Sequence, residues 1–178
     1  MAQLDNLETK LDEVLNKKAP FKLPESARKT LAGALWWLTG IGGVLQVWAA
    51  YTLWKDWHYV DDLAQAANAW ARAYGVDTGV GELGIGFYLS LAVLAVSGVL
   101  LLLAVAGLKA FKKAGWNLVF YSLLVNLAYG VVVAFTDYGG FGDLIGAAIG
   151  SVIGAYLLFQ VRGHFSGKTA HAAVPKAS

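Results

Sequence analysis

Uncharged residues gather into four long runs along this chain, and charged residues bound each run. The first three runs contain 25, 26 and 23 residues, and the fourth contains 18. The hydrocarbon core of a bilayer is about 30 Å thick and takes roughly 20 helical residues to cross. The pattern therefore predicts four membrane-spanning helices, at residues 30–54, 83–108, 116–135 and 143–161.

Two further helices are predicted outside these runs. Between Leu4 and Leu15, leucine and valine recur at helical spacing among acids and lysines, as in an amphipathic helix. It either forms a coiled coil or docks on a partner, or it lies on the membrane surface or against its own bundle. An apolar stripe from Val60 to Tyr74 predicts a helix along the outer surface. We expect an all-α fold: an integral membrane four-helix bundle with an N-terminal amphipathic helix and an outer interfacial helix.

The chain divides into three parts on this reading. Charges and prolines mark off the ends, and we expect no cleavable signal peptide because no short apolar core lies near residue 1. The polar C-terminal part is expected to lack order. The parts are a cytoplasmic amphipathic helix with its linker (1–29), a four-span membrane domain that includes an outer segment (30–161, with 55–82 outside) and a cytoplasmic tail (162–178).

The positive charges indicate the orientation. Of the fourteen Lys and Arg residues, all except Lys55 and Arg72 fall in the two terminal segments and the 109–113 loop, which lie on one side in a four-span topology. Basic loops remain in the cytoplasm. We therefore predict a multi-pass protein of the cytoplasmic (inner) membrane with both termini cytoplasmic.

Composition agrees with a membrane protein and excludes some functions. The hydrophobic fraction is 57% and the mean hydropathy is +0.54, above ordinary soluble domains. A net charge of +2 is too small to argue for nucleic acid as a partner. Since the chain has no cysteine, disulfides, thiolate metal sites and cysteine nucleophiles are excluded.

Glycine recurs at every fourth position in the fourth predicted span. This spacing puts the glycines on one side of a helix, where another helix can approach closely. Three interpretations stay open: packing on a neighbouring helix of the same chain, self-association, or the lining of a pore in an oligomer. The helix-packing candidates are Gly142, Gly146, Gly150 and Gly154.

No Asp, Glu, Lys, Arg or His lies inside the four uncharged runs, which argues against proton-coupled transport and charged-substrate sites. The intramembrane polar residues are Gln46, Asn117 and Asn126. An amide facing lipid would lose hydrogen bonds at a cost of several kcal/mol. We expect Asn126 to bond to Ser or Tyr on a neighbouring helix; contact with a polar ligand is the alternative.

Aromatic residues mark the boundary of the outer segment. Tryptophan and tyrosine collect at membrane–water interfaces, because their rings are apolar and their N–H or O–H group needs water. The predicted interface anchors are Trp54, Trp57, Trp70 and Tyr74.

Catalytic patterns are missing from the sequence. It has no nucleophile–base spacing, phosphate-binding loop or paired membrane carboxylates. His58 precedes Asp61 and Asp62, but no third metal ligand is evident. We therefore predict a protein that is not an enzyme and holds no metal; no cofactor is indicated, and a bound pigment or lipid stays open.

Two stretches, Lys113–Tyr121 and Ile145–Arg162, resemble small multi-span bacterial membrane proteins that are generally described as uncharacterised. The resemblance implies no activity. We expect a structural or accessory subunit that acts through helix packing and partner binding, in the lipid bilayer, as a homo-oligomer or within a larger membrane complex. The alternative is a channel or carrier for a neutral or apolar solute, which convergence of the polar residues Gln46, Ser97, Ser122 and Asn126 on a cavity would favour.

Overall fold

The computed structural model describes residues 2–19, 21–75, 85–134 and 141–165. For residues 2, 3, 5, 60, 85, 86, 133, 134 and 141–148 it describes the backbone alone. All regular structure in this part of the chain is helical, which confirms the all-α prediction. The elements are α1 (Ala2–Asp12), the π-helical turn η1 (Glu13–Lys17), α2 (Glu25–Ala73), α3 (Ile85–Lys109), α4 (Lys113–Ala134), α5 (Phe141–Gln160) and the 3-10 turn η2 (Arg162–Phe165).

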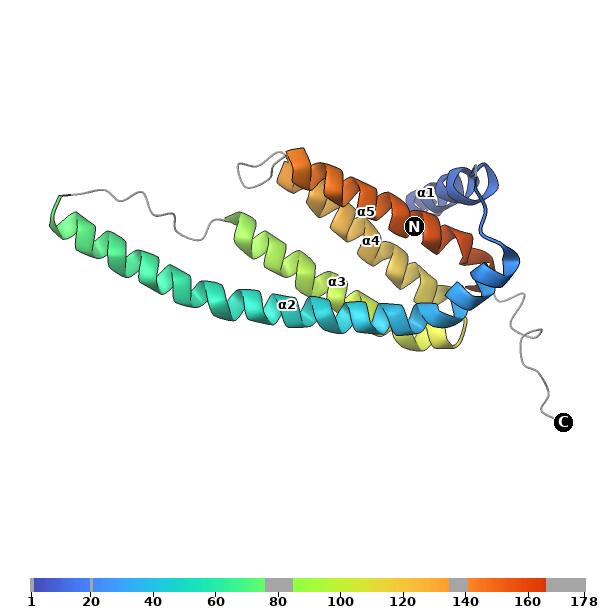
Figure 1. Cartoon of the computed structure of the whole chain (residues 1–178), viewed down its shortest axis with the longest axis horizontal. Coiled ribbons are helices and arrows are strands. Elements are labelled where there is room, and N and C mark those ends of the chain that lie inside the picture. The colour runs from blue at the N-terminus through green and yellow to red at the C-terminus, as the bar shows by residue number, and fades with distance from the viewer. Residues whose placement is uncertain (1, 20, 76–84, 135–140, 166–178) are drawn as a thin grey trace.

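The long helices pack in chain order. The main contacts join α2 to α3, α3 to α4 and α4 to α5 (Figure 1), and η1, which follows α1, contacts α5. Three helices are long and apolar enough to cross a membrane: α2, Phe87–Lys109 of α3 and Lys113–Val132 of α4. The described apolar part of the fourth, Ile149–Gln160, is shorter. The four-span count and a closed four-helix bundle stay predictions.

Helix α2 joins two elements that the sequence analysis separates. It continues past residue 54 without a break and has 49 residues, a length of about 73 Å. The physical reason is local, because neither glycine nor proline occurs between Gly43 and Gly75. Gly75, with a φ of 73°, follows the end of the helix. The expected separate outer helix is therefore the second part of α2, which reaches beyond the start of α3 (Figure 1).

The turn between α3 and α4 carries an unusual residue. Phe111 donates its N–H to the Leu108 carbonyl at 2.9 Å, and Lys112 donates to the Gly107 carbonyl at 2.8 Å. This pair of bonds is the Schellman motif, in which the residue after the helix is left-handed and usually glycine. Phe111 takes that conformation with a φ of 50°, and its ring stacks on Phe165 at 5.6 Å.

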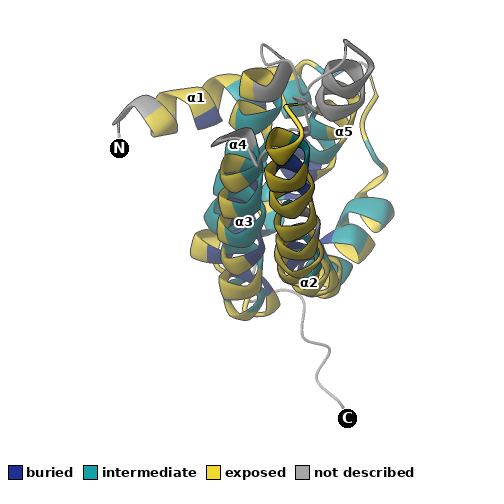
Figure 2. Cartoon of the chain, turned by 90° about the vertical axis from the view of Figure 1, so that its left-hand side faces the viewer, coloured by how far each residue is buried: buried dark blue, intermediate teal, exposed yellow. Residues whose placement is uncertain are grey.

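The hydrophobic core lies at one end of the helices. The last turns of α3 and α5 and the first turns of α2 and α4 meet there around Trp116, Phe120 and Phe159, whose rings contact one another. Phe165 of η2 is also buried in this cluster, although residues from 162 onwards were expected to lack order. Elsewhere α2 and α3 present mainly exposed or half-buried residues (Figure 2).

Candidate functional site

The two ends of the described chain meet at an ionic cluster of Glu8, Asp12, Lys113 and Arg162, called here the ionic clamp. Arg162 donates from Nε and Nη2 to Glu8 Oε1, at 2.9 and 2.6 Å. Its Nη1 lies 3.2 Å from Asp12 Oδ2, and Lys113 Nζ lies 3.3 Å from Glu8 Oε1. The Glu8 and Asp12 side chains are only 7% and 10% exposed. The clamp therefore neutralises two buried carboxylates with two cations.

Local structure sets these side chains in place. Glu8 and Asp12 are four residues apart, so they lie one above the other on the same face of α1. Arg162 follows the end of α5, where the helix dipole favours a cation. Its guanidinium lies 5.8 Å from the centre of the Trp116 ring. Trp116 in turn donates its Nε1–H to the Leu158 carbonyl at 3.0 Å, which fixes the ring against α5.

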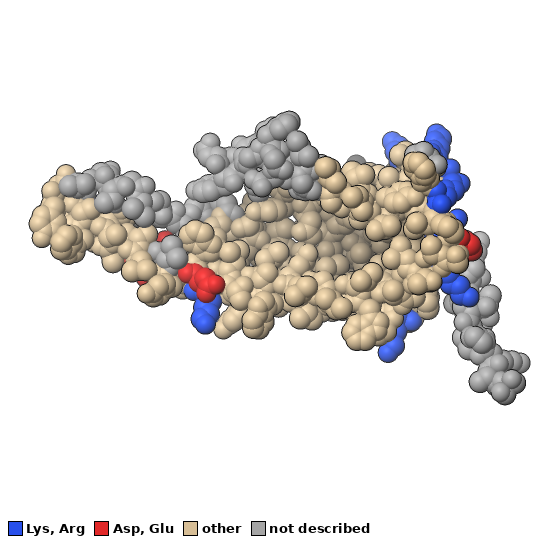
Figure 3. Space-filling view, viewed as in Figure 1, with Lys and Arg blue, Asp and Glu red and all other residues tan. Residues whose placement is uncertain are grey.

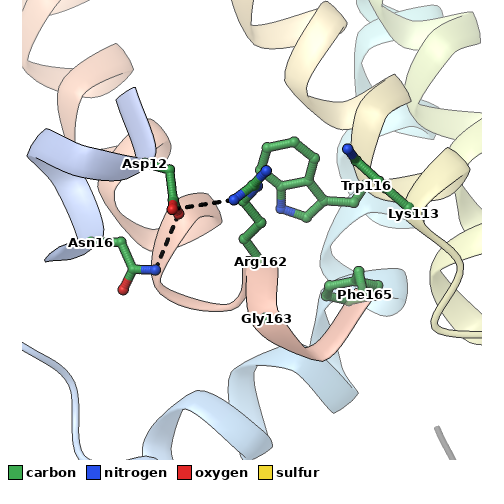
Figure 4. A pocket seen from close by; sticks show the side chains of 7 residues that line it. All are labelled: Asp12, Asn16, Lys113, Trp116, Arg162, Gly163 and Phe165. Carbon is green, nitrogen blue, oxygen red and sulfur yellow. Dashed lines mark hydrogen bonds and ion pairs between the residues drawn. The ribbon is translucent and has the colours of Figure 1, made fainter. Parts of the chain in front are cut away.

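A cavity of about 420 Å³ adjoins the clamp (Figure 4). Acidic, basic and aromatic side chains line this cavity. The described residues contain no group of three His, Asp or Glu side chains that could hold a metal ion. The clamp charges are engaged with one another, so this arrangement is suited to holding α1 in place. The lining residues are Asp12, Asn16, Lys113, Trp116, Arg162, Gly163 and Phe165.

Hydrogen bonds from α5 also hold η1 and the segment that follows it. Gln160 donates its side-chain N–H to the Leu15 carbonyl at 3.0 Å, and its oxygen accepts from the Leu23 N–H at 3.4 Å. The Tyr156 hydroxyl donates to the Phe21 carbonyl at 2.6 Å. Several positions were predicted for the amphipathic N-terminal helix. In the structure it lies against the other helices of its own chain.

The ionic clamp was not predicted from the sequence. A signal was available, because Glu8 and Asp12 fall on the same helical face as Leu11 and Leu15, which pack on the core. A carboxylate on the apolar face of an amphipathic helix predicts a buried cationic partner. The partner itself, Arg162, had no such signal in the sequence.

Two of the predicted polar residues take part in contacts between or within helices. Ser97 of α3 donates to Gln46 Oε1 of α2 at 2.7 Å, and Ser122 of α4 donates to the Ser97 carbonyl at 3.4 Å. Asn126 donates to the Ser122 carbonyl of its own helix at 2.8 Å, where a bond to a neighbouring helix was expected. The Asn117 side-chain oxygen is buried and has no hydrogen-bond partner among the described residues.

The structure describes the packing of two of the four glycines in the predicted row. Gly142 and Gly146 belong to the segment of α5 described by its backbone alone, so their packing lies outside the described residues. A Cβ atom on Gly154 would lie 3.5 Å from Leu123 of α4. A Cβ atom on Gly150 would meet no atom within 4 Å, so Gly150 packs on no helix in the described part of this chain.

Closer helix approaches occur at other glycines. A Cβ atom on Gly98 of α3 would lie 3.0 Å from Val47 of α2, and one on Gly43 of α2 would lie 3.1 Å from the Gly98 carbonyl. Gly115 is tighter still, since a Cβ atom there would lie 2.5 Å from the carbonyl carbon of Gly107. These contacts between helices have no regular glycine spacing in the sequence, and only the tertiary structure reveals them.

Three of the predicted interface anchors lie on α2, and the fourth, Tyr74, directly follows the end of this helix. Trp54 stands 4.4 Å from His58, and Trp57 contacts Phe87 of α3 at 5.9 Å between ring centres. Trp70 and Tyr74 contact each other at 4.8 Å and are 71% and 70% exposed.

No protein-family model, curated protein or solved structure matches the chain. These comparisons leave the resemblance to small bacterial membrane proteins an expectation.

Proposed function

We propose that the protein is a non-enzymatic integral protein of the bacterial cytoplasmic membrane that serves as an accessory subunit. In this proposal both termini lie in the cytoplasm, and the protein binds a second membrane protein on the opposite side. The observation that carries the proposal is the part of α2 that continues beyond α3, residues 58–73, together with Tyr74, which follows it; this segment is called here the α2 extension. It begins next to Trp57, which contacts Phe87 near the start of α3.

Exposed apolar side chains along the helices support the membrane placement. Leu45 and Trp48 of α2 and Leu103 of α3 are all exposed. Leaving such side chains in water forfeits about 25 cal/mol for each Å² of apolar surface. A bilayer removes this cost, and the three long apolar helices are suited to it.

The α2 extension supports partner binding. Its helical part, residues 58–73, spans about 24 Å along the helix axis. The extension carries the exposed side chains Leu63, Trp70 and Tyr74. Asp61 and Asp62 lie near its beginning, and their charges disfavour a position in the hydrocarbon core. An extramembrane helix with a large exposed aromatic surface is typical of an interaction site. Its partner should offer a complementary apolar groove outside the membrane.

A channel or carrier for a neutral or apolar solute is the second candidate. It requires an oligomer, and the open face of α5 favours one: Gly150 lies among the exposed residues Ile149, Val152 and Ile153. The polar groups of Gln46 and Ser97 support it less, because they hydrogen-bond to each other between α2 and α3. We therefore place the accessory role first.

The test is the mass of the protein purified in mild detergent from membranes of its own host, with co-purifying proteins identified. We expect a defined complex with one membrane protein. The double substitution Trp70→Ala/Tyr74→Ala should remove that partner, because both exposed rings lie in the α2 extension. Trp37→Ala is the control, since Trp37 is an exposed aromatic at the other end of α2.

Three results would count against the accessory role. A protein that purifies alone, or a partner retained by Trp70→Ala/Tyr74→Ala, contradicts it. A homo-oligomer without a partner favours the second candidate, and solute flux in liposomes would then test it.

A further inference from the structure

The acidic side chains near the ionic clamp are all engaged within the protein. Glu8 and Asp12 belong to the clamp, Glu13 pairs with Lys18 at 2.8 Å, and Glu25 lies 3.7 Å from Arg28. These are the acidic residues whose side chains the structure describes at this end. Their negative charge is therefore balanced locally by specific cations.

The same end of the protein carries further lysines that take no part in these ion pairs. Six of them are exposed and pair with no carboxylate in the described part of the chain. Figure 3 shows basic atoms gathered at the end that holds α1 and the turn between α3 and α4. Lys109 is partly held, because its Nζ lies 5.2 Å from the centre of the Trp36 ring. The six are Lys10, Lys17, Lys22, Lys29, Lys109 and Lys112.

Apolar side chains stand among these lysines. Phe21 is 80% exposed, although its backbone carbonyl is held by the Tyr156 hydroxyl at 2.6 Å. Val14 of η1 is also exposed. A held backbone that presents a phenylalanine between lysines 17 and 22 is typical of a surface that enters the lipid headgroup region.

We propose that this end of the protein is a binding surface for anionic phospholipid headgroups. The inference rests on the proposed function, because it takes the helices to lie in a bilayer. The six lysines supply the attraction, and each lysine near an anionic membrane surface strengthens binding by about fivefold. The ionic clamp contributes by pairing Glu8 and Asp12 with Arg162, which keeps two negative charges from repelling the headgroups and holds α1 beside them.

The test uses the full chain reconstituted in phosphatidylcholine vesicles that contain either brominated phosphatidylglycerol or brominated phosphatidylcholine. Bromine quenches nearby tryptophan fluorescence, so the two titrations give the binding constant of the anionic lipid relative to the neutral one. We expect wild type to prefer phosphatidylglycerol several-fold. The preference should fall as salt is raised from about 0.05 to 0.5 M, because the Debye length shortens from above 10 Å to below 5 Å.

Two matched pairs of substitutions locate the surface. K29Q/K112Q removes two exposed lysines at the clamp end, and K55Q/R72Q removes the two described basic residues on the far part of α2. No tryptophan changes in either pair. The first pair should lower the preference for phosphatidylglycerol by at least about threefold, and the second should leave it unchanged.

The outcomes separate the two proposals. If wild type prefers neither lipid, or if both pairs lower the preference equally, the headgroup surface is refuted while the membrane placement stands. If neither brominated lipid quenches the fluorescence, the protein is not inserted in the bilayer, and the proposed function fails as well.

Discussion

Arg162 and Glu8 are 154 residues apart in the sequence, and two hydrogen bonds of 2.9 and 2.6 Å join the guanidinium to one carboxylate oxygen. The contact ties the N-terminal helix to the end of α5. It also brings the amphipathic segment next to the buried Trp116, over which the guanidinium lies. The N-terminal helix is therefore part of the folded unit, and Arg162 is the cation that pairs with both of its buried carboxylates.

Replacement of Arg162 by methionine should destabilise the protein and release α1. Glu8 would keep Lys113 as a partner, Asp12 would keep only its hydrogen bond from Asn16 in the described part of the chain, and both carboxylates would remain mostly buried. We expect a loss of about 2–4 kcal/mol, near the lower part of the range for a broken buried pair because Arg162 is partly exposed. Thermal unfolding in detergent measures the loss, and faster trypsin cleavage at Lys10 and Lys17 reports the release of α1.

Neutralising the carboxylates provides the control for that prediction. The triple variant Glu8→Gln/Asp12→Asn/Arg162→Met leaves no buried carboxylate charge, and Lys113, which loses its partner, is half exposed, so the variant should recover part of the stability lost in Arg162→Met. If the triple variant is less stable than Arg162→Met, the loss does not come from buried unpaired charge.

Phe111 should tolerate glycine better than alanine. Both substitutions remove the stacking on Phe165, but only glycine accepts a φ of 50° without steric cost. We expect Phe111→Gly to be more stable than Phe111→Ala by about 1 kcal/mol. Thermal or denaturant unfolding of the two variants measures the difference. Equal stabilities would show that the left-handed conformation is not retained in the variants.

Gly115 and Gly150 should respond in opposite ways to alanine. A Cβ atom on Gly115 would clash with the backbone of Gly107 and Leu108, so Gly115→Ala should cost about 1–3 kcal/mol or more. Gly150→Ala should be neutral or stabilising by up to about 1 kcal/mol, because the added methyl meets no neighbour and alanine favours the helix. Melting temperatures of the two variants in the same detergent test the contrast.

A larger residue at Gly150 tests self-association separately from folding. Gly150→Leu should leave the stability of the single chain nearly unchanged, since space is open there. If the native protein is a homo-oligomer joined through this face, the substitution should reduce its mass in detergent. An unchanged mass would assign the open face to lipid.

Ser97 should matter more than Ser90 on the same helix. Ser97 is fully buried and donates to Gln46 of α2, whereas Ser90 donates to the Phe87 carbonyl of its own helix. Ser97→Ala should therefore cost about 0.6–2 kcal/mol, the range for a hydrogen bond between membrane helices, and Ser90→Ala should cost less. Unfolding in detergent measures the stability of both variants. Equal losses of stability would show that the hydrogen bond between α2 and α3 does not contribute.

The local pattern of residues was enough to predict the helices. Charge-free runs and helical spacing predicted an all-α chain, the N-terminal amphipathic helix and helices at the positions of α3, α4 and α5 to within a few residues. The same local pattern did not predict the length of α2. The charges from Lys55 onwards indicated the end of a membrane span, but a charge ends a span without ending a helix, and no glycine or proline breaks α2 there.

The contacts between distant segments were decided only by the tertiary structure. Arg162 was assigned to a polar tail, yet it pairs with Glu8 because α5 ends next to α1. The regular glycine row was expected to mark the closest packing, while the tightest described approach lies at Gly107 and Gly115, where α3 turns into α4. The sequence by itself thus determined which segments are helical and apolar, since these properties depend on neighbours along the chain. The partners of each side chain depend on how the helices pack, and only the fold brings those residues together.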